Sequence, residues 1–325
     1  LVWYDTPVDS TPEQSCKFTD LVHELQPDCL VCDRVGNGFG DYAVLGDNEF
    51  PYGSQNMDGE VPATLNHSWG FKRNDHDWKS VQSLLYSLIR SASNGCNYLL
   101  NIGPQADGTV PEESIERLRT IGCWMSINGE AIYGAGAAPF PNPFPWGMAT
   151  SKGNNLYFIF SEWPGETFVL KGLKSRVIRA ALPADPEVLV TVEQNRVLKL
   201  TNLPPNAPDE YFSVIKLELD GAPEAEQRIL QSDDGTILLL SANAEVSGSV
   251  SMGRKGLPLG FRENSGSLRW EFALERPGRY RVEALTNRHW SHEWISGIHV
   301  AVSSDGTSIE AELKPDQRLD NIQSK

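Results

Sequence analysis

The fold is decided by the stretch SVQSLLYSLIRSASNGCNYLLNI, residues 80–102. Its first half follows a capping serine and repeats apolar residues on one helical face: Val81, Leu84, Leu85 and Leu88. Gly95 closes this helix, and a short apolar run from Asn97 to Ile102 is typical of a buried strand. A helix that leads directly into a buried strand predicts a β-α repeat with a parallel sheet.

Similar units flank this stretch. We expect a strand at residues 1–4, a helix that begins at Thr11-Pro12 and ends near Leu25, and a strand at residues 29–32. Pro111 opens a further helix, whose predicted core stripe is Ile115, Leu118, Ile121 and Met125. A closed (β/α)8 barrel needs eight units and about 250 residues, so the three or four units here predict a partial barrel.

The second half of the chain has the pattern of an all-β protein. A proline-rich connector at residues 134–147 cannot continue a helix, and short strands separated by Gly, Pro and Asn follow it. We therefore expect three parts: a partial (β/α)8-type barrel at residues 1–145, an antiparallel β-sandwich at 146–221 and a second β-sandwich at 222–325. In the third part, Trp270, Trp290 and Trp294 fit either core packing or a carbohydrate-binding surface.

Composition narrows the classes of function. The 325 residues carry a formal net charge of −15, which argues against a nucleic-acid partner, and no apolar run approaches the roughly 20 residues of a membrane span. The five cysteines are an odd number, and Cys29 and Cys32 fit ordinary buried thiols better than a zinc or redox pair. The histidines lack metal-ligand spacing, so we expect no metal and no cofactor.

Candidate catalytic groups are acidic. Asp5 follows the first expected strand, at the edge where parallel barrels present catalytic side chains, although such an aspartate also fits a turn or cap. A long polar segment, residues 35–77, is expected to be a functional loop and contains several acids: Asp41, Asp47, Glu49, Asp58 and Glu60. Glycoside hydrolysis needs two carboxylates, whereas any single loop acid also fits a solvated charge.

Several ordered motifs make residues 1–133 resemble the α-L-fucosidases of glycoside hydrolase family 29. They are WYDT (3–6), CDRVGNGFGDY (32–42), GDNEFP (46–51), EVPATLNHSWGF (60–71), NGCNYLLNIGP (94–104) and INGEAIY (127–133). The resemblance implies a retaining exo-glycosidase that removes terminal α-L-fucose from glycans or glycosides by double displacement. It also implies a β-sandwich after the barrel and a secreted or periplasmic location.

The resemblance implies roles for particular residues. Asp5 matches the nucleophile, Trp3 and Arg34 match positions that line the fucose pocket, and Trp69 lies in a motif beside it. From the residues alone, Arg34 also fits an ion pair with Asp33 or a loop acid, and Trp69 fits core packing.

The acid/base residue is left open between two glutamates. Glu60 is the first choice and Glu49 the second, because the position of this residue differs between subgroups of the family. The chosen glutamate must be protonated before the first step and act as a base in the second. The tryptophan that commonly precedes it is Gly59 here.

The N-terminal half-barrel of the family, with its fucose-binding histidines, is missing from the sequence, which starts at Leu1 inside an apolar segment. We therefore expect the isolated chain to be an inactive or poorly folded fragment of a fucosidase. The alternative is a non-catalytic carbohydrate-binding protein on a degenerate barrel, for which Asp5 would be dispensable. The sequence does not indicate an oligomeric state.

Overall fold

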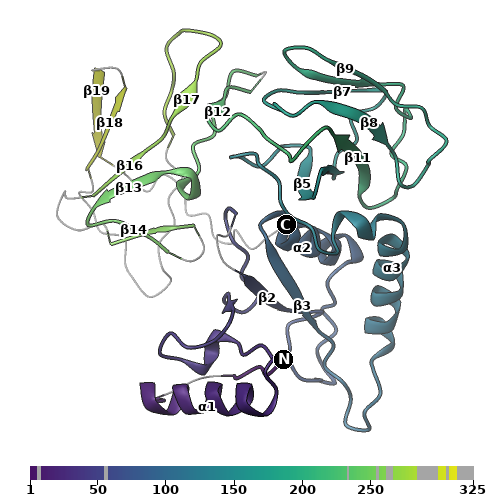
Figure 1. Cartoon of the computed structure of the whole chain (residues 1–325), viewed down its shortest axis with the longest axis vertical. Coiled ribbons are helices and arrows are strands. Elements are labelled where there is room, and N and C mark those ends of the chain that lie inside the picture. The colour runs from purple at the N-terminus through teal and green to yellow at the C-terminus, as the bar shows by residue number, and fades with distance from the viewer. Residues whose placement is uncertain are drawn as a thin grey trace. The chain divides into compact units, whose positions relative to one another are not determined.

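The computed structural model describes residues 1–5, 9–54, 58–232, 234–253, 256–260, 266–283, 299–304 and 307–312. The chain divides into two compact units, residues 1–275 and 276–325 (Figure 1). The first unit contains a mixed α/β part followed by all-β structure, as the sequence predicts at this coarse level.

A three-stranded parallel sheet organises the α/β part. Its strands are β1 (Ala43–Val44), β2 (Gly59–Thr64) and β3 (Cys96–Asn101), in the order β1-β2-β3. Helix α2 (Val81–Ser93) connects β2 to β3, with Ser80 as its N-cap and Gly95 in the left-handed region at a φ of 76°. The helix and the following strand predicted from residues 80–102 are therefore confirmed, as is the parallel sheet.

The other predicted helices are also present. Helix α1 (Pro12–Leu25) starts with a capping box, in which the Gln14 amide donates to Thr11 and the Thr11 amide donates to Gln14. Helix α3 spans Glu112–Asn128, and short 3-10 turns lie at Asp33–Val35 (η1), Gly129–Ala131 (η2) and Ser241–Asn243 (η3).

Three details of the α/β part differ from the sequence-based expectation. Residues 1–4 and 29–32 form isolated parallel bridges, Val2 with Val31 and Cys32 with Tyr42, instead of full strands. The segment 35–77 is not one loop, because it contains β1 and the completely buried strand β2. The sequence of β2, GEVPAT, did not predict a central strand, because its polar residues, glycine and proline are unusual there.

The predicted stripe of α3 is only partly correct. Leu118 is exposed, whereas Trp124 is 3% exposed and donates its indole N–H to the Phe212 carbonyl at 2.8 Å. Ile121 and Met125 do pack beside Trp124. The C-terminal half of the helix is the part that contacts the β-sandwich, so burial is concentrated there.

Two antiparallel sheets form a β-sandwich after the helices. The five-stranded sheet has the order β4-β5-β6-β11-β8, and the three-stranded sheet has the order β7-β10-β9. Their bounds are β4 Gly136–Ala137, β5 Gly147–Lys152, β6 Asn155–Phe160, β7 Thr167–Leu170, β8 Val177–Ala181, β9 Thr191–Gln194, β10 Leu198–Thr201 and β11 Ser213–Leu219. Strand β4 thus lies within the proline-rich connector. The rings of Phe144 and Trp146 in this connector stack on each other with their centres 4.4 Å apart, and both pack against the sandwich core.

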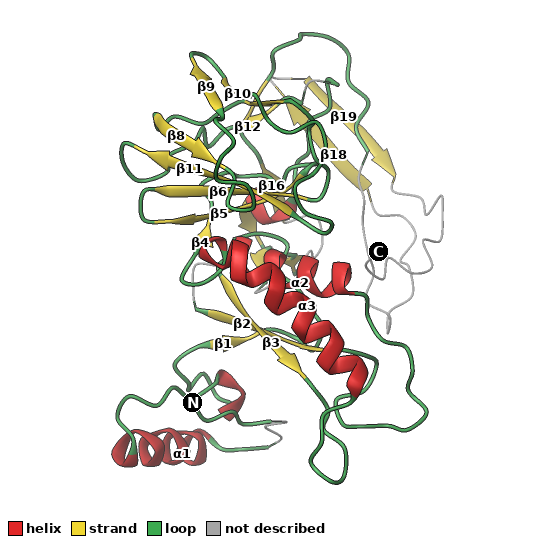
Figure 2. Ribbon diagram, turned by 90° about the vertical axis from the view of Figure 1, so that its right-hand side faces the viewer, coloured by secondary structure: helices red, strands yellow, loops and turns green. Residues whose placement is uncertain are grey.

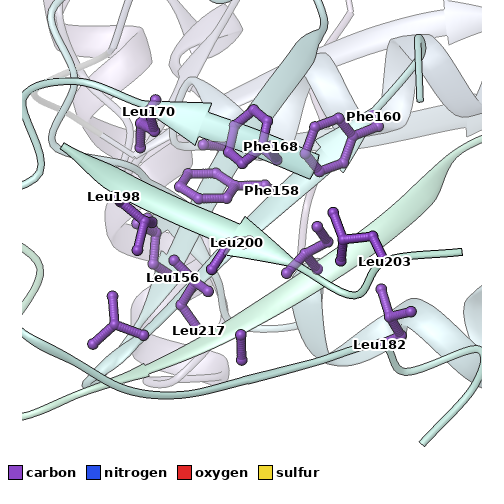
Figure 3. Packing of buried hydrophobic residues seen from close by; sticks show 14 of the residues in the cluster. Leu156, Phe158, Phe160, Phe168, Leu170, Leu182, Leu198, Leu200, Leu203 and Leu217 are labelled. Carbon is purple, nitrogen blue, oxygen red and sulfur yellow. The ribbon is translucent and has the colours of Figure 1, made fainter. Parts of the chain in front are cut away.

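Strand β6 connects the α/β part to the β-sandwich, because both of its faces are buried. Alternate residues such as Phe158 point into the core between the two sheets (Figure 3). The intervening residues Tyr157 and Ile159 pack against Leu85 and Ile89 of α2. Figure 2 shows α2 and α3 between the parallel sheet and the five-stranded sheet. The sandwich therefore supports the helices behind the parallel sheet.

The remaining strands of the first unit form small two-stranded sheets: β12 (Ile229–Leu230) with β17 (Phe272–Ala273), β13 (Glu245–Gly248) with β16 (Gly266–Arg269), and β14 (Ser251–Met252) with β15 (Pro258–Leu259). In the second unit, β18 (His299–Ser304) and β19 (Thr307–Glu312) form an antiparallel hairpin. Trp270 donates its indole N–H to the Leu240 carbonyl at 2.7 Å, while Trp290 and Trp294 lie outside the described residues.

Candidate functional site

The candidate site is built on a series of parallel segments. Val2 bridges Val31, Cys32 bridges Tyr42, and β1 pairs with β2, so that consecutive segments of the chain lie side by side in one direction. Side chains that follow these segments therefore gather at their common carboxyl edge. The register also pairs Glu60 with Val44, the last residue of β1, which brings Glu60 level with this edge.

Arg34 lies at the centre of the site. It follows the bridged Cys32 and donates from Nη1 to Asp5 Oδ1 at 3.1 Å and from Nη2 to Asp47 Oδ1 at 2.5 Å. Its side chain is 20% exposed. Burial alone would lower the pKa of Arg34, but the hydrogen bonds and charges of Asp47 and Asp5 outweigh it and raise the pKa. The guanidinium therefore holds two carboxylates in fixed directions.

Trp3 connects Arg34 to Glu60. The Arg34 guanidinium carbon lies 4.7 Å from the centre of the Trp3 ring, within the range of a cation–π contact. The indole N–H of Trp3 donates to Glu60 Oε1 at 2.6 Å. Because an indole nitrogen can only donate, this contact engages Oε1 and leaves the second oxygen of Glu60 for other partners. Asp5, Arg34, Trp3 and Glu60 thus form one continuous chain of contacts.

Glu60 has a buried carboxylate on a central strand. The residue is 7% exposed and lies on β2, so the structure corrects the expectation of a loop acid. The hydroxyl of Tyr42 is buried nearby and has no hydrogen-bond partner among the described residues. Burial, followed by the negative charge of Glu60, raises the pKa of Tyr42 above its usual value. Asp5, in contrast, is 67% exposed.

The turn at residues 46–49 supplies Asp47 and Glu49. Asn48 has a φ of 55°, and its Oδ1 accepts from the Thr64 amide at 3.1 Å and from Lys79 Nζ at 2.7 Å. This anchors the turn on the end of β2. Glu49 is exposed, and its carboxylate lies directly over Gly46, where a side chain would clash.

Asp47 is the site residue that sequence reasoning did not single out. It was one of several acids in the segment 35–77, and nothing in its spacing distinguishes it from Asp41 or Asp58. Its distinguishing feature is the contact with Arg34, which depends on the turn that follows β1. For Arg34, the predicted ion pair with a loop acid and the contact with Asp5 occur together.

Trp69 lies on the loop that follows β2. Its carbonyl accepts from Asn101 Nδ2 at 2.6 Å, and the residue is 39% exposed, which excludes core packing. Trp69 comes nine residues after Glu60 in the chain, and none of its contacts with described residues is with Arg34 or Trp3.

The described residues contain no cluster of three or more His, Cys, Asp or Glu side chains that could hold a metal. His67 pairs with Asp77 at 2.6 Å on the surface. All five cysteines are free, with Cys29 and Cys32 buried. No helix in the described parts of the chain has the length and hydropathy of a membrane span.

A parallel α/β sheet with two connected carboxylates at its carboxyl edge is an arrangement found in glycoside hydrolases. A sequence profile of the family described as alpha-L-fucosidase matches residues 1–130. Human tissue alpha-L-fucosidase is 31% identical over 243 residues, which are 67% of this chain and 51% of that protein. The chain belongs to the α-L-fucosidase family, glycoside hydrolase family 29.

Solved structures extend this relationship beyond the profile. The alpha-L-fucosidase from Vibrio sp. strain EJY3 is 26% identical, with a TM-score of 0.76 over 97% of this chain and 56% of that chain. Alpha-L-fucosidase isoenzyme 1 from Paenibacillus thiaminolyticus is 30% identical, with a TM-score of 0.60 over 67% of this chain and 57% of that chain. The chain spans about half the length of the human relative it matches.

Proposed function

We propose that this chain carries the catalytic carboxylates of a retaining α-L-fucosidase that hydrolyses terminal fucose from glycans or glycosides. One observation supports this proposal most directly: Arg34 and Trp3 connect Asp5 to Glu60, two acids 55 positions apart in the sequence. Family membership adds the class of substrate.

Asp5 is the proposed nucleophile. It is the more exposed of the two acids, and Arg34 Nη1 holds Oδ1 of the carboxylate that must attack the anomeric carbon. The attack forms an ester between a carboxylate oxygen of Asp5 and the sugar, and the bond to the leaving-group oxygen breaks. Arg34 also has further N–H groups that can bind sugar oxygens, and Trp3 and Trp69 can cover the apolar side of fucose.

Glu60 is the proposed acid/base. Trp3 fixes one of its oxygens, so the other can donate a proton to the departing oxygen and then take one from the incoming water. Glu49 is the second choice, because it is exposed and lies in the turn that carries Asp47. The effect of the leaving group on the hydrolysis rate distinguishes Glu60 from Glu49. A poor leaving group needs a proton from the acid, so loss of the true acid slows hydrolysis of a methyl α-L-fucoside far more than that of a dinitrophenyl α-L-fucoside.

We further propose the three-part organisation of residues 1–145, 146–221 and 222–325, with the sandwich supporting α2 and α3 from behind. Because this chain covers only 51% of the human relative and 56% of the Vibrio sp. enzyme, we propose that a complete fucose pocket needs the part of them that this chain does not cover. The isolated chain is then inactive or nearly so. We propose a secreted or periplasmic location for the whole protein, since a relative of 32% identity over 142 residues is named plasma alpha-L-fucosidase.

Hydrolysis of 4-nitrophenyl α-L-fucoside tests this function. The assay compares the chain alone with a chimera that joins it to the part of the Vibrio sp. enzyme that this chain does not cover. We expect turnover by the chimera and little by the chain. Asp5→Ala should abolish it and azide should restore it, while Glu60→Gln should lower it by about 10²- to 10⁴-fold on poor leaving groups. A folded chimera whose turnover is unaffected by Asp5→Ala would contradict the proposal.

A further inference from the structure

A separate cavity of about 310 Å³ lies beside the loops that follow β2 and β3, next to the first turn of α3. Its wall includes Phe71, Lys72, Arg73, His76, Trp78 and Gln105. None of these residues belongs to the group formed by Asp5, Arg34, Trp3 and Glu60. Its volume is at the lower end of the range of about 300 to 1,000 Å³ that is typical of small-molecule sites.

The cavity lies at the same edge of the sheet as the candidate catalytic site. Strands β2 and β3 are parallel and end at Thr64 and Asn101, and the loops that line the cavity begin after these ends. Asp5 and Arg34 likewise follow parallel segments of the same array. A ligand in the cavity would therefore be at the functional edge of the sheet.

The cavity wall has the chemistry of a sugar site. Phe71 is 40% exposed, and Trp78 offers a second aromatic ring, with the Arg117 guanidinium carbon 5.7 Å from its centre. Aromatic faces of this kind can cover the apolar face of a pyranose.

The polar part of the wall carries both signs of charge. Lys72 and Arg73 form no ion pair with any described residue. Asp75, Glu112 and Glu113 lie in the same wall, and Glu112 Oε1 lies 3.8 Å from Arg119 Nη1. Gln105 adds an amide that can both donate and accept. Sugar hydroxyls also donate and accept, whereas a single anion would be repelled by the acids. This balance favours a neutral saccharide.

Hydrogen bonds fix the loop that forms most of this wall. Ser68 Oγ donates to Asp75 Oδ2 at 2.5 Å, and Asn101 Nδ2 donates to the Trp69 carbonyl at 2.6 Å. Arg117 Nε donates to the Lys79 carbonyl at 2.7 Å. These contacts hold both ends of the loop, so binding would require little ordering of the backbone.

We propose that this cavity binds a neutral sugar residue of the leaving group, the glycan from which fucose is removed. This inference rests on the proposed function for the identity of the ligand. It adds a second binding position, formed by the loops after β2 and β3, that would help select among fucosylated glycans.

Nuclear magnetic resonance of the ¹⁵N-labelled 325-residue chain tests the inference without any need for turnover. The probes are lactose and N,N′-diacetylchitobiose, and the Trp78 indole signal is assigned from its loss in Trp78→Phe. We expect at least one probe to shift the indole signal of Trp78 and the side-chain amide of Gln105 in a saturable way. Phe71→Ala should weaken this binding at least fivefold, because it removes an aromatic face from the cavity wall. Phe71 is exposed, so its loss should not disturb folding.

Tyr133→Ala is the matched control, since Tyr133 is 67% exposed and does not line the cavity. It should leave the affinity unchanged. The inference is overturned if neither disaccharide shifts Trp78, or if Phe71→Ala and Tyr133→Ala have equal effects. L-Fucose separates the two proposals when it is added to the folded chimera, in which we expect the fucose pocket to be complete: it should shift the Trp3 indole signal and leave the Trp78 signal unchanged. In the chimera, a response of Trp78 to disaccharide with no response of Trp3 to fucose would support the cavity and contradict the proposed catalytic site.

Discussion

Replacement of Trp3 by phenylalanine should loosen strand β2, because it removes the indole N–H that donates to the buried carboxylate of Glu60 at 2.6 Å. Glu60 is 7% exposed, so water cannot readily replace the lost donor. A buried acceptor that loses its hydrogen-bond donor costs about 1–3 kcal/mol. At about 1.4 kcal/mol for each tenfold change, this corresponds to roughly 5- to 150-fold faster opening of the strand.

Amide hydrogen exchange of the peptide that covers Gly59–Thr64 measures this opening in the native chain. Trp163→Phe is the matched control, because Trp163 donates its indole N–H to the Pro204 carbonyl at 2.8 Å in the β-sandwich. The control should leave exchange in β2 unchanged. A second variant, Glu60→Gln, should reduce the effect of Trp3→Phe, since the two residues form one contact. If Trp3→Phe changes exchange in β2 by less than about twofold, the coupling between these residues is refuted.

Three further predictions concern other parts of the first unit. Asn48→Ala should lower the stability of β2 by about 1–3 kcal/mol, because Asn48 holds a φ of 55° and accepts from the Thr64 amide; urea-dependent hydrogen exchange measures this, and Asn48→Gly, which relieves the backbone strain, should cost less. Burial raises the pKa of Cys96 to about 11, so maleimide at pH 8 should label the exposed Cys123 and spare Cys96 in the folded chain; equal labelling by mass spectrometry would contradict this. The hydrogen bond from Arg228 lowers the pKa of Glu226 to about 2 from an ordinary value of 4.5, so its contribution to stability is present above about pH 4.5 and is lost as the pH falls through 2; ¹³C titration should show the pKa return toward 4.5 in Arg228→Met.

Local sequence signals predicted the helices and strand β3 well. Thr11 and Ser80 cap α1 and α2 as expected, because capping depends on side chains within three residues of the helix start. The sequence NLYFIF of β6 has no polar–apolar alternation, because both faces of that strand meet apolar neighbours.

Sequence reasoning failed where burial depends on distant partners. Strand β2 has the polar sequence GEVPAT, and it is buried because β1 and β3 flank it. The apolar stripe of α3 likewise did not predict that Trp124 would be buried and would donate a hydrogen bond to the Phe212 carbonyl. In both cases the deciding contact is made across the fold and leaves no local pattern.

The candidate site divides in the same way. The motifs identified Asp5, Arg34 and Glu60, and the structure joins these residues through Trp3. The sequence predicted an ion pair between Arg34 and a loop acid but did not identify Asp47 as that acid, because the contact requires the turn at residues 46–49 to lie on the end of β2. The structure was therefore needed to identify Asp47 as a residue of the candidate site.

The central claim is that Asp5 forms a transient bond to the anomeric carbon of fucose. Its most direct test is mass spectrometry of the active chimera after reaction with 2-deoxy-2-fluoro-α-L-fucosyl fluoride, which slows hydrolysis of the covalent intermediate. We predict a single fluorofucosyl label on the peptide that contains Asp5. A label on Asp47, Glu49 or Glu60, or turnover with no labelled peptide, would contradict the account.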